Sequence, residues 1–268
     1  MRCYRIVIAA SLVMLLSAVP VLAEDPIWSL SGFVDYSRGD YGTGKDTTLL
    51  YIPFRLGVTP IERFTVSLTV PYIEQDTQTV FLTGGGVAVR KEKARELRTA
   101  RASVTRTESG LGDVLLKGQY VLLEERPTFP EISPYLKVKF PTADEDRGLG
   151  TGEFDETLGV DLTKTFLERL VAYLTLAYTF IGSPSGTELH KSFAWSVGAA
   201  YLVATPFSIF AFLDGATALA AGQEDPLELR VGAEYRLTKA LRLSGSAGAG
   251  LSSGSPNYDL MGGFAVRF

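Results

Sequence analysis

Apolar and polar residues alternate with a period of two along most of the chain, from about residue 27 onward. This alternation predicts β-strands with two different faces. In residues 227–237, one face carries Leu227, Leu229, Val231, Ala233, Tyr235 and Leu237, and the other carries Glu228, Arg230, Gly232, Glu234 and Arg236. Four charged side chains on one face would be costly in a dry core, so we expect that face to line a wet interior or to meet bulk water.

About twelve segments share this pattern, and the connections between them alternate in length. The segments are residues 27–38, 48–58, 64–73, 113–123, 131–141, 154–164, 170–181, 191–203, 207–218, 226–237, 240–250 and 259–268. The short connections are 59–63, 124–130, 165–169, 204–206 and 238–239, and the long ones are 39–47, 74–112, 142–153, 182–190, 219–225 and 251–258. Short turns at one end and long loops at the other are typical of membrane barrels. The sequence therefore predicts an all-β fold, a closed transmembrane antiparallel β-barrel of about 12 strands with periplasmic termini.

One uncharged stretch, from Ser192 to Leu213, is also long enough for a membrane helix. Two features favour strands instead. The stretch contains a turn signal, Ala204-Thr205-Pro206, near its middle, and the side chains before that turn, from Phe193 to Val203, alternate. We expect a β-hairpin here.

The first 23 residues have the composition of a secretory signal peptide. A positive start at Arg2 and Arg5 precedes an apolar run, and small residues end the segment. We expect cleavage after about Ala23, which leaves residues 24–268 as the barrel domain of a protein exported to the outer membrane of a Gram-negative bacterium.

The chain ends in an alternating segment whose terminal residue, Phe268, is aromatic. This resembles the C-terminal signature of bacterial outer-membrane barrels. The resemblance implies that the barrel-insertion machinery is a partner and reads the last strand.

Aromatic residues near the predicted strand ends fall on the predicted outward face. They are Trp28, Tyr36, Tyr72, Tyr120, Tyr178, Trp195, Tyr201 and Tyr235. Strands are rich in aromatic residues in any case, but this placement favours aromatic girdles at the two membrane interfaces.

Charge and composition exclude several other classes of protein. The 268 residues include 26 Lys+Arg and 30 Asp+Glu, a net charge of −4, so binding of nucleic acid by bulk positive charge is not expected. The only cysteine is Cys3 and the only histidine is His190, which excludes the usual zinc sites and any disulfide within the chain. We expect no metal, no cofactor and no catalytic residues.

Two segments are similar to a known family. They are Ser109-Gly110-Leu111-Gly112-Asp113, and KVKFPTADEDRGLGTGEFDETLGVDLTKTF at 137–166. With the signal peptide and the terminal phenylalanine, they resemble the outer-membrane proteins grouped as "MetA-pathway of phenol degradation". The resemblance implies a barrel of about twelve strands that passes small, often hydrophobic or aromatic, compounds, and it brings no catalytic residues.

The predicted interior face carries both signs of charge. Candidates for the lumen or solute path are Arg55, Asp113, Lys117, Gln119, Lys137, Lys139, Asp161, Glu228, Arg230, Glu234 and Arg236. Such residues can pair and stiffen the barrel, or they can create a transverse field that orients polar solutes. At about twelve strands we expect a narrow or partly blocked pore.

The connection 74–112 is the longest, and it contains a basic run. Candidates for contact with lipopolysaccharide phosphates are Arg90, Lys91, Lys93, Arg95, Arg98 and Arg101. Two other interpretations stay open: an inward-folded plug hinged at Gly84–Gly86, and a solvated or projecting loop.

Three functions are compatible with the sequence. The first is an outer-membrane channel that gives small molecules, including hydrophobic or aromatic ones, passive passage through a narrow barrel; the solute itself is not specified. The second is a plugged structural or adhesive anchor. The third is an outer-membrane lipase, because the two-residue spacing of His190 and Ser192 resembles the His and Ser of outer-membrane phospholipase A. We expect no enzyme, since the alternation places Ser192 on the inward face.

Overall fold

The fold is described from a computed structural model, which covers residues 27–41, 46–76, 80–83, 86–89, 107–184 and 188–268. The predicted signal peptide, residues 1–23, lies outside these ranges. The six candidate lipopolysaccharide contacts between Arg90 and Arg101 do so too.

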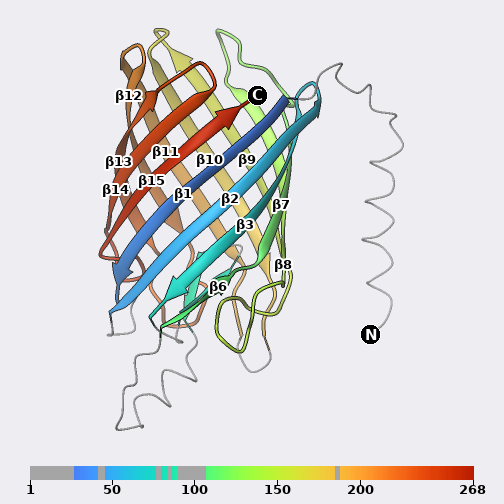
Figure 1. The fold of residues 1–268 in the computed structure, drawn as a ribbon, viewed down its shortest axis with the longest axis vertical. Coiled ribbons are helices and arrows are strands. Elements are labelled where there is room, and N and C mark those ends of the chain that lie inside the picture. Colours follow the sequence, from blue (N-terminus) through green and yellow to red (C-terminus); the bar gives the residue numbers. More distant parts are fainter. Residues whose placement is uncertain (1–26, 42–45, 77–79, 84–85, 90–106, 185–187) are drawn as a thin grey trace.

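The described chain forms one closed antiparallel β-barrel (Figure 1). Its strands are β1 (Ile27–Gly39), β2 (Thr47–Ile61), β3 (Phe64–Gln75), β6 (Glu108–Leu111), β7 (Val114–Tyr120), β8 (Glu131–Phe140), β9 (Asp155–Phe166), β10 (Leu170–Ile181), β11 (Ser192–Ala204), β12 (Phe207–Ala216), β13 (Leu227–Arg236), β14 (Leu241–Gly250) and β15 (Tyr258–Arg267). Each strand pairs with its neighbours in sequence, and β15 pairs with β1 to close the wall. Because β6 and β7 both pair with β3 and lie end to end, these thirteen strands fill twelve positions. The predicted closed barrel is confirmed.

Strand boundaries follow the sequence pattern closely, with one substantial difference. The predicted strand 113–123 begins earlier, as β6 at Glu108, is interrupted at Gly112 and Asp113, and ends as β7 at Tyr120. Its early start follows from β3, which runs on to Gln75 and pairs with Glu108. The long connection is therefore 76–107, and it contains a separate hairpin of β4 (Val80–Thr83) and β5 (Gly86–Val89).

The uncharged stretch from Ser192 to Leu213 forms the hairpin β11–β12, as predicted. Among the described residues, no helix is long and apolar enough to cross a membrane.

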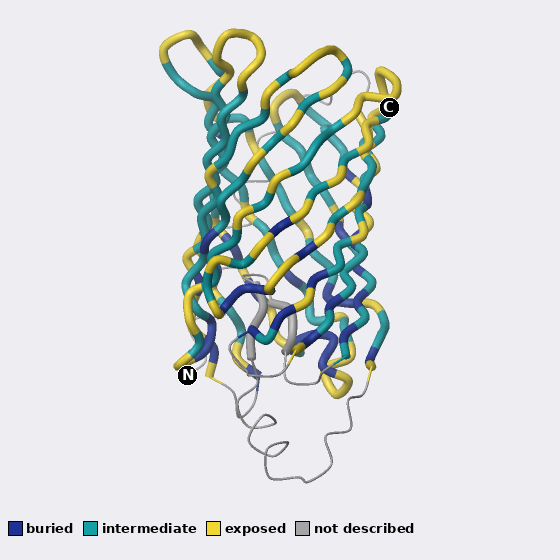
Figure 2. The backbone as a smooth tube through the Cα atoms, turned by 90° about the vertical axis from the view of Figure 1, so that its left-hand side faces the viewer, coloured by how far each residue is buried: buried dark blue, intermediate teal, exposed yellow. Residues whose placement is uncertain are grey.

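Burial in the barrel is reversed relative to a water-soluble protein. Buried residues of the described chain are mostly polar, including Thr69, Asp155 and Ser192, whereas many large apolar side chains, such as Phe54 and Val231, are exposed. The exposed apolar side chains alternate along each strand with inward ones, as the period-two pattern requires. A continuous apolar outer wall is suited to lipid. Figure 2 shows that the buried positions gather toward the end of the barrel with the long loops.

Backbone hydrogen bonds at the short-turn end close the wall. Trp28 N donates to Phe268 O at 2.8 Å, and Phe268 N donates to Trp28 O at 2.9 Å. The predicted interface aromatics all fall on the outward side of their strands by register, Trp28, Tyr120 and Tyr235 among them. Their placement agrees with the expected girdles.

Candidate solute pathway

A cavity of about 480 Å³ lies inside the long-loop half of the barrel. Its lining comes from β1, β2, β8 to β13 and β15, and from the long loops. It includes Asp35 and Ser37 of β1, Tyr51 of β2, Tyr135 and Lys137 of β8, Thr175 of β10, Asp214 of β12, Glu228 and Arg230 of β13, and Asp259 of β15. This volume is in the range of small-molecule sites, and the polar side chains in its lining follow from the inward polar face of each strand.

One wall of this cavity is acidic. Arg230 on β13 lies at its centre: Nε is 3.2 Å from Asp259 Oδ1, and the terminal nitrogens are 3.6 Å from Asp214 and 3.5 Å from Glu228. Asp35 lines the cavity beside these groups. When all are ionised, four carboxylates face one guanidinium, so this wall carries an excess of negative charge.

The opposite side of the lumen is basic, and its Lys137 lines the cavity. Lys117 Nζ lies 3.3 Å from Asp161 and 3.9 Å from the centre of the Tyr135 ring. Lys137 pairs with Lys117 across β7 and β8, and Arg55 Nε donates to Thr69 Oγ1 at 3.2 Å. Three cations therefore face the lumen here, and the carboxylate of Asp161 on β9 lies beside Lys117.

These two walls face each other across the lumen. In the ring of twelve positions β7 is fourth and β13 is tenth, so the two strands are six positions apart and diametrically opposed. Opposite charges on facing walls produce a field across the lumen, perpendicular to the barrel axis. A solute in the cavity would be oriented by that field.

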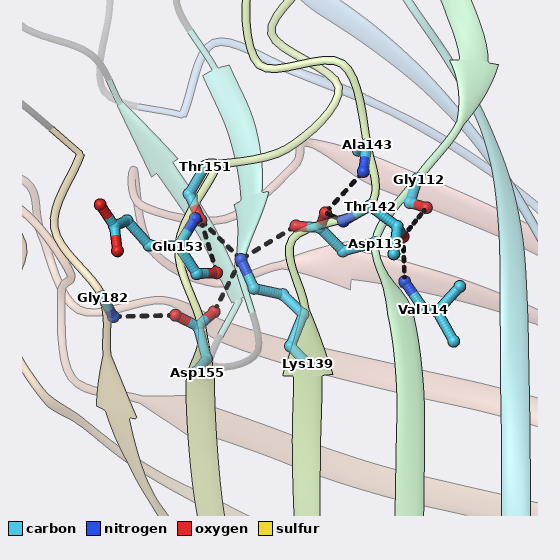
Figure 3. A network of polar contacts seen from close by, with 10 residues as sticks. All are labelled: Gly112, Asp113, Val114, Lys139, Thr142, Ala143, Thr151, Glu153, Asp155 and Gly182. Carbon is cyan, nitrogen blue, oxygen red and sulfur yellow. Dashed lines mark hydrogen bonds and ion pairs between the residues drawn. The ribbon is translucent and has the colours of Figure 1, made fainter. Parts of the chain in front are cut away.

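The loop 141–154 folds over the mouth on the basic side, and one lysine anchors it (Figure 3). Lys139 Nζ lies 3.0 Å from Asp113 Oδ2 and 3.1 Å from Asp155 Oδ2, and it donates to Thr151 Oγ1 at 2.6 Å. The side chains of Lys139, Asp113 and Asp155 are 3%, 6% and 0% exposed, respectively. Asp113 Oδ1 also accepts from the backbone N–H groups of Thr142 and Ala143, both at 3.0 Å. The network ties both ends of the loop to the barrel wall.

The middle of the same loop is also held inside the mouth. Gln75 Nε2 donates to Gly148 O at 2.8 Å, and Leu149 packs against Leu49 and Ile73 of the barrel wall. Arg147 Nε donates to Glu108 at 2.9 Å, and this bond raises the pKa of the guanidinium above its usual value. The loop therefore narrows the entrance.

Tyr41, in the connection after β1, also lies inside the mouth. It is buried, its hydroxyl lies 3.1 Å from Ser37 Oγ, and it lines the cavity. Burial raises the pKa of its hydroxyl to about 12.

All eleven predicted lumen residues are located on the inner side of the wall. Register with inward neighbours places ten of them there, and Asp113 is placed by its ion pair with Lys139. Glu228, Arg230 and Lys137 line the cavity, whereas Asp113 and Lys139 belong to the mouth network. Glu234 and Arg236 lie nearer the short-turn end, where Glu234 is 3.7 Å from Arg242.

Two cavity carboxylates, Asp35 and Asp259, were missed by the sequence reasoning. The alternation could have located both. Asp35 is next to the outward Val34 on β1 and Asp259 is next to the outward Leu260 on β15, so both carboxylates must face inward. The inward fold of loop 141–154 was also missed, since a turn rich in Gly and Asp gives no sign of what Leu149 and Thr151 contact.

A closed twelve-stranded barrel with an apolar outer wall and a charged, hollow interior defines an outer-membrane β-barrel protein. The chain belongs to the family described as "Putative MetA-pathway of phenol degradation", whose sequence profile matches residues 47–268. This confirms the family resemblance. No curated protein matches the sequence.

Solved structures share the fold at low sequence identity. The COG4313 outer membrane channel from Pseudomonas putida F1 is 17% identical, with a TM-score of 0.68 over 92% of this chain and 97% of that chain. The NanC porin is 9% identical, with a TM-score of 0.54 over 88% and 98%. The KdgM porin in complex with disordered oligogalacturonate is 11% identical, with a TM-score of 0.52 over 90% and 99%.

Proposed function

We propose that this protein is a passive outer-membrane channel for small molecules. The observation that carries the proposal is the cavity of about 480 Å³ inside a closed barrel, with Arg230 and its carboxylates on one wall and Lys137 on the other. A filled anchor would need no such space or charge separation. Transport would be downhill, since the sequence has no nucleotide-binding motif.

Two further points support a channel. The structural relatives with this fold are named as a channel and as porins. The second point is the name of the family, which refers to a pathway of phenol degradation. A pathway of that kind would require entry of small aromatic compounds, and we include these among the solutes.

The lipase alternative is disfavoured by the position of Ser192. Its side chain is fully buried on the inner side of β11, next to Thr179, whereas a lipase of the membrane surface needs its nucleophile on the lipid side. His190 is exposed in the preceding loop. We therefore propose that the protein is not an enzyme.

The anchor alternative is favoured by the narrowing of the mouth by loop 141–154. Swelling of liposomes that contain the refolded protein separates the two functions. A channel admits small neutral solutes, such as a pentose, faster than larger oligosaccharides. Liposomes that swell no faster than protein-free ones, with folding confirmed by heat-dependent gel mobility, would favour the anchor.

We also propose how the protein reaches and contacts the outer membrane. Residues 1–23 act as a signal peptide cleaved after about Ala23, and the last strand ending at Phe268 is read by the insertion machinery. The basic run from Arg90 to Arg101 contacts lipopolysaccharide phosphates at the outer leaflet. N-terminal sequencing of the mature protein tests the cleavage point, and co-purification of lipopolysaccharide with a variant in which these cations are glutamine tests the contact.

A further inference from the structure

Three neighbouring aromatic side chains on β10 and β12 line the inner wall of the barrel, and the outward girdles do not explain them. Tyr173 of β10 pairs with Gly198 of β11, and Gly198 pairs in turn with Phe212 of β12. These positions are in phase with the inward residues Ser196 and Asp214, so the rings face the lumen. Phe210, two residues before Phe212 on β12, has the same orientation.

The three rings form one connected cluster, the inner aromatic ladder. The ring centres of Tyr173 and Phe212 are 5.7 Å apart, and those of Phe212 and Phe210 are 5.9 Å apart. Both distances are within the range of favourable ring contacts. Each residue is only partly buried, and because it faces inward, its exposed surface is exposed to the lumen.

Glycines on the adjacent strands allow these rings to lie against the wall. A Cβ placed on Gly198 would overlap the Phe212 ring, and one on Gly232 would overlap the Phe210 ring. The rings thus occupy the space that neighbouring side chains would fill, which leaves their other surface for a solute.

The position of the ladder continues the cavity toward the periplasm. Phe212 is two residues before Asp214 on β12, so it lies about 7 Å closer to the short-turn end of the barrel. Phe210, two residues before Phe212, lies about 7 Å closer still. A solute that leaves the acidic wall of the cavity in this direction reaches the ladder next.

We infer that the inner aromatic ladder is a solute-binding subsite that selects planar aromatic rings, by stacking them on Phe212 and Phe210. The inference rests on the proposed channel function and names its specificity-determining residues. Stacking favours a flat ring over a saturated ring of similar size and equal charge. The charge of the solute is then recognised by the walls above, and its ring by the ladder.

Current blockade in planar bilayers tests the subsite. Benzoate is compared with cyclohexanecarboxylate, and benzylammonium with cyclohexylmethylammonium, so that each pair differs only in the ring. We expect at least one aromatic ion to dwell longer than its saturated partner, by about two- to tenfold. The double variant Phe210→Leu/Phe212→Leu should lose this difference.

The matched control is Phe207→Leu, because Phe207 is on the same strand but faces outward and is exposed. It should keep the difference in dwell time. Conductance without any aromatic preference in the wild type, or an equal loss in the control, would overturn the subsite while leaving the channel intact.

Direct binding separates the two proposals if no current is seen. The ¹⁹F lines of 4-fluorobenzoate and 4-fluorobenzylammonium are recorded with the refolded protein in lipid nanodiscs. Broadening that disappears in the double variant and persists in Phe207→Leu supports the subsite even in a barrel that does not conduct. Equal broadening in all three proteins, or none in the wild type, contradicts it.

Discussion

Lys139 and Asp155 face each other across β8 and β9, and their side chains form an ion pair of 3.1 Å that is almost completely shielded from solvent. Asp113 and Thr151 complete the surroundings of the ammonium group. One cation therefore holds two buried carboxylates and the start and end of loop 141–154. This arrangement makes Lys139 the residue on which the shape of the mouth depends.

Replacement of Lys139 by methionine should release the loop. Asp113 and Asp155 would be left as buried carboxylates without their cation, a change that typically costs about 3–5 kcal/mol. We expect a lower thermal stability and a larger single-channel conductance, because the loop leaves the mouth. The matched control is Lys117→Met, which removes an inward lysine that has a single, more exposed partner, Asp161. A conductance of Lys139→Met equal to that of the wild type would show that the loop does not limit the pore.

Neutralisation of the cavity charges should change ion selectivity with a defined sign. Arg230→Gln leaves four carboxylates on the acidic wall without their guanidinium, so cation preference should rise. Asp214→Asn should shift it the other way. The measurement is the reversal potential in a KCl gradient. Arg63→Gln is the control, since Arg63 pairs with Glu124 outside the cavity at a short turn. Equal shifts for Arg230→Gln and Arg63→Gln would refute a selective role of the cavity.

The orientation of the barrel can be tested with protease sites. A site inserted in the connection 76–107 should be cleaved on intact cells, because long loops face outward. A site between Pro127 and Thr128, in the short connection after β7, should be protected until the outer membrane is permeabilised. The reverse pattern would invert the proposed topology.

Phe268 has two separable roles. Its backbone exchanges two hydrogen bonds with Trp28 at the closure of the barrel, and its ring ends the last strand. Phe268→Ala keeps the backbone bonds and removes the ring. We expect it to refold in detergent like the wild type but to assemble poorly in cells, measured as heat-modifiable protein in outer-membrane fractions. Phe268→Tyr, which keeps an aromatic end, should assemble normally, and normal assembly of Phe268→Ala would exclude recognition of the ring.

The barrel itself could be predicted because each strand has to alternate between lipid and lumen. A one-residue slip would place Arg230 or Lys137 in the membrane, so the period of two determines both the face and the register. The same rule located the cavity charges, and it applies equally to Asp35, Asp259 and Phe212. The alternation gives no information about contacts between a long loop and the barrel wall. Leu149 against Ile73 and Thr151 against Lys139 depend on the three-dimensional path of loop 141–154.

Single-channel recording of the refolded mature chain in a planar bilayer shows whether the charged interior is a pore. We expect discrete conductance steps, with a selectivity that Arg230→Gln shifts toward cations. A folded barrel that gives no steps, both as the wild type and as Lys139→Met, would contradict this expectation.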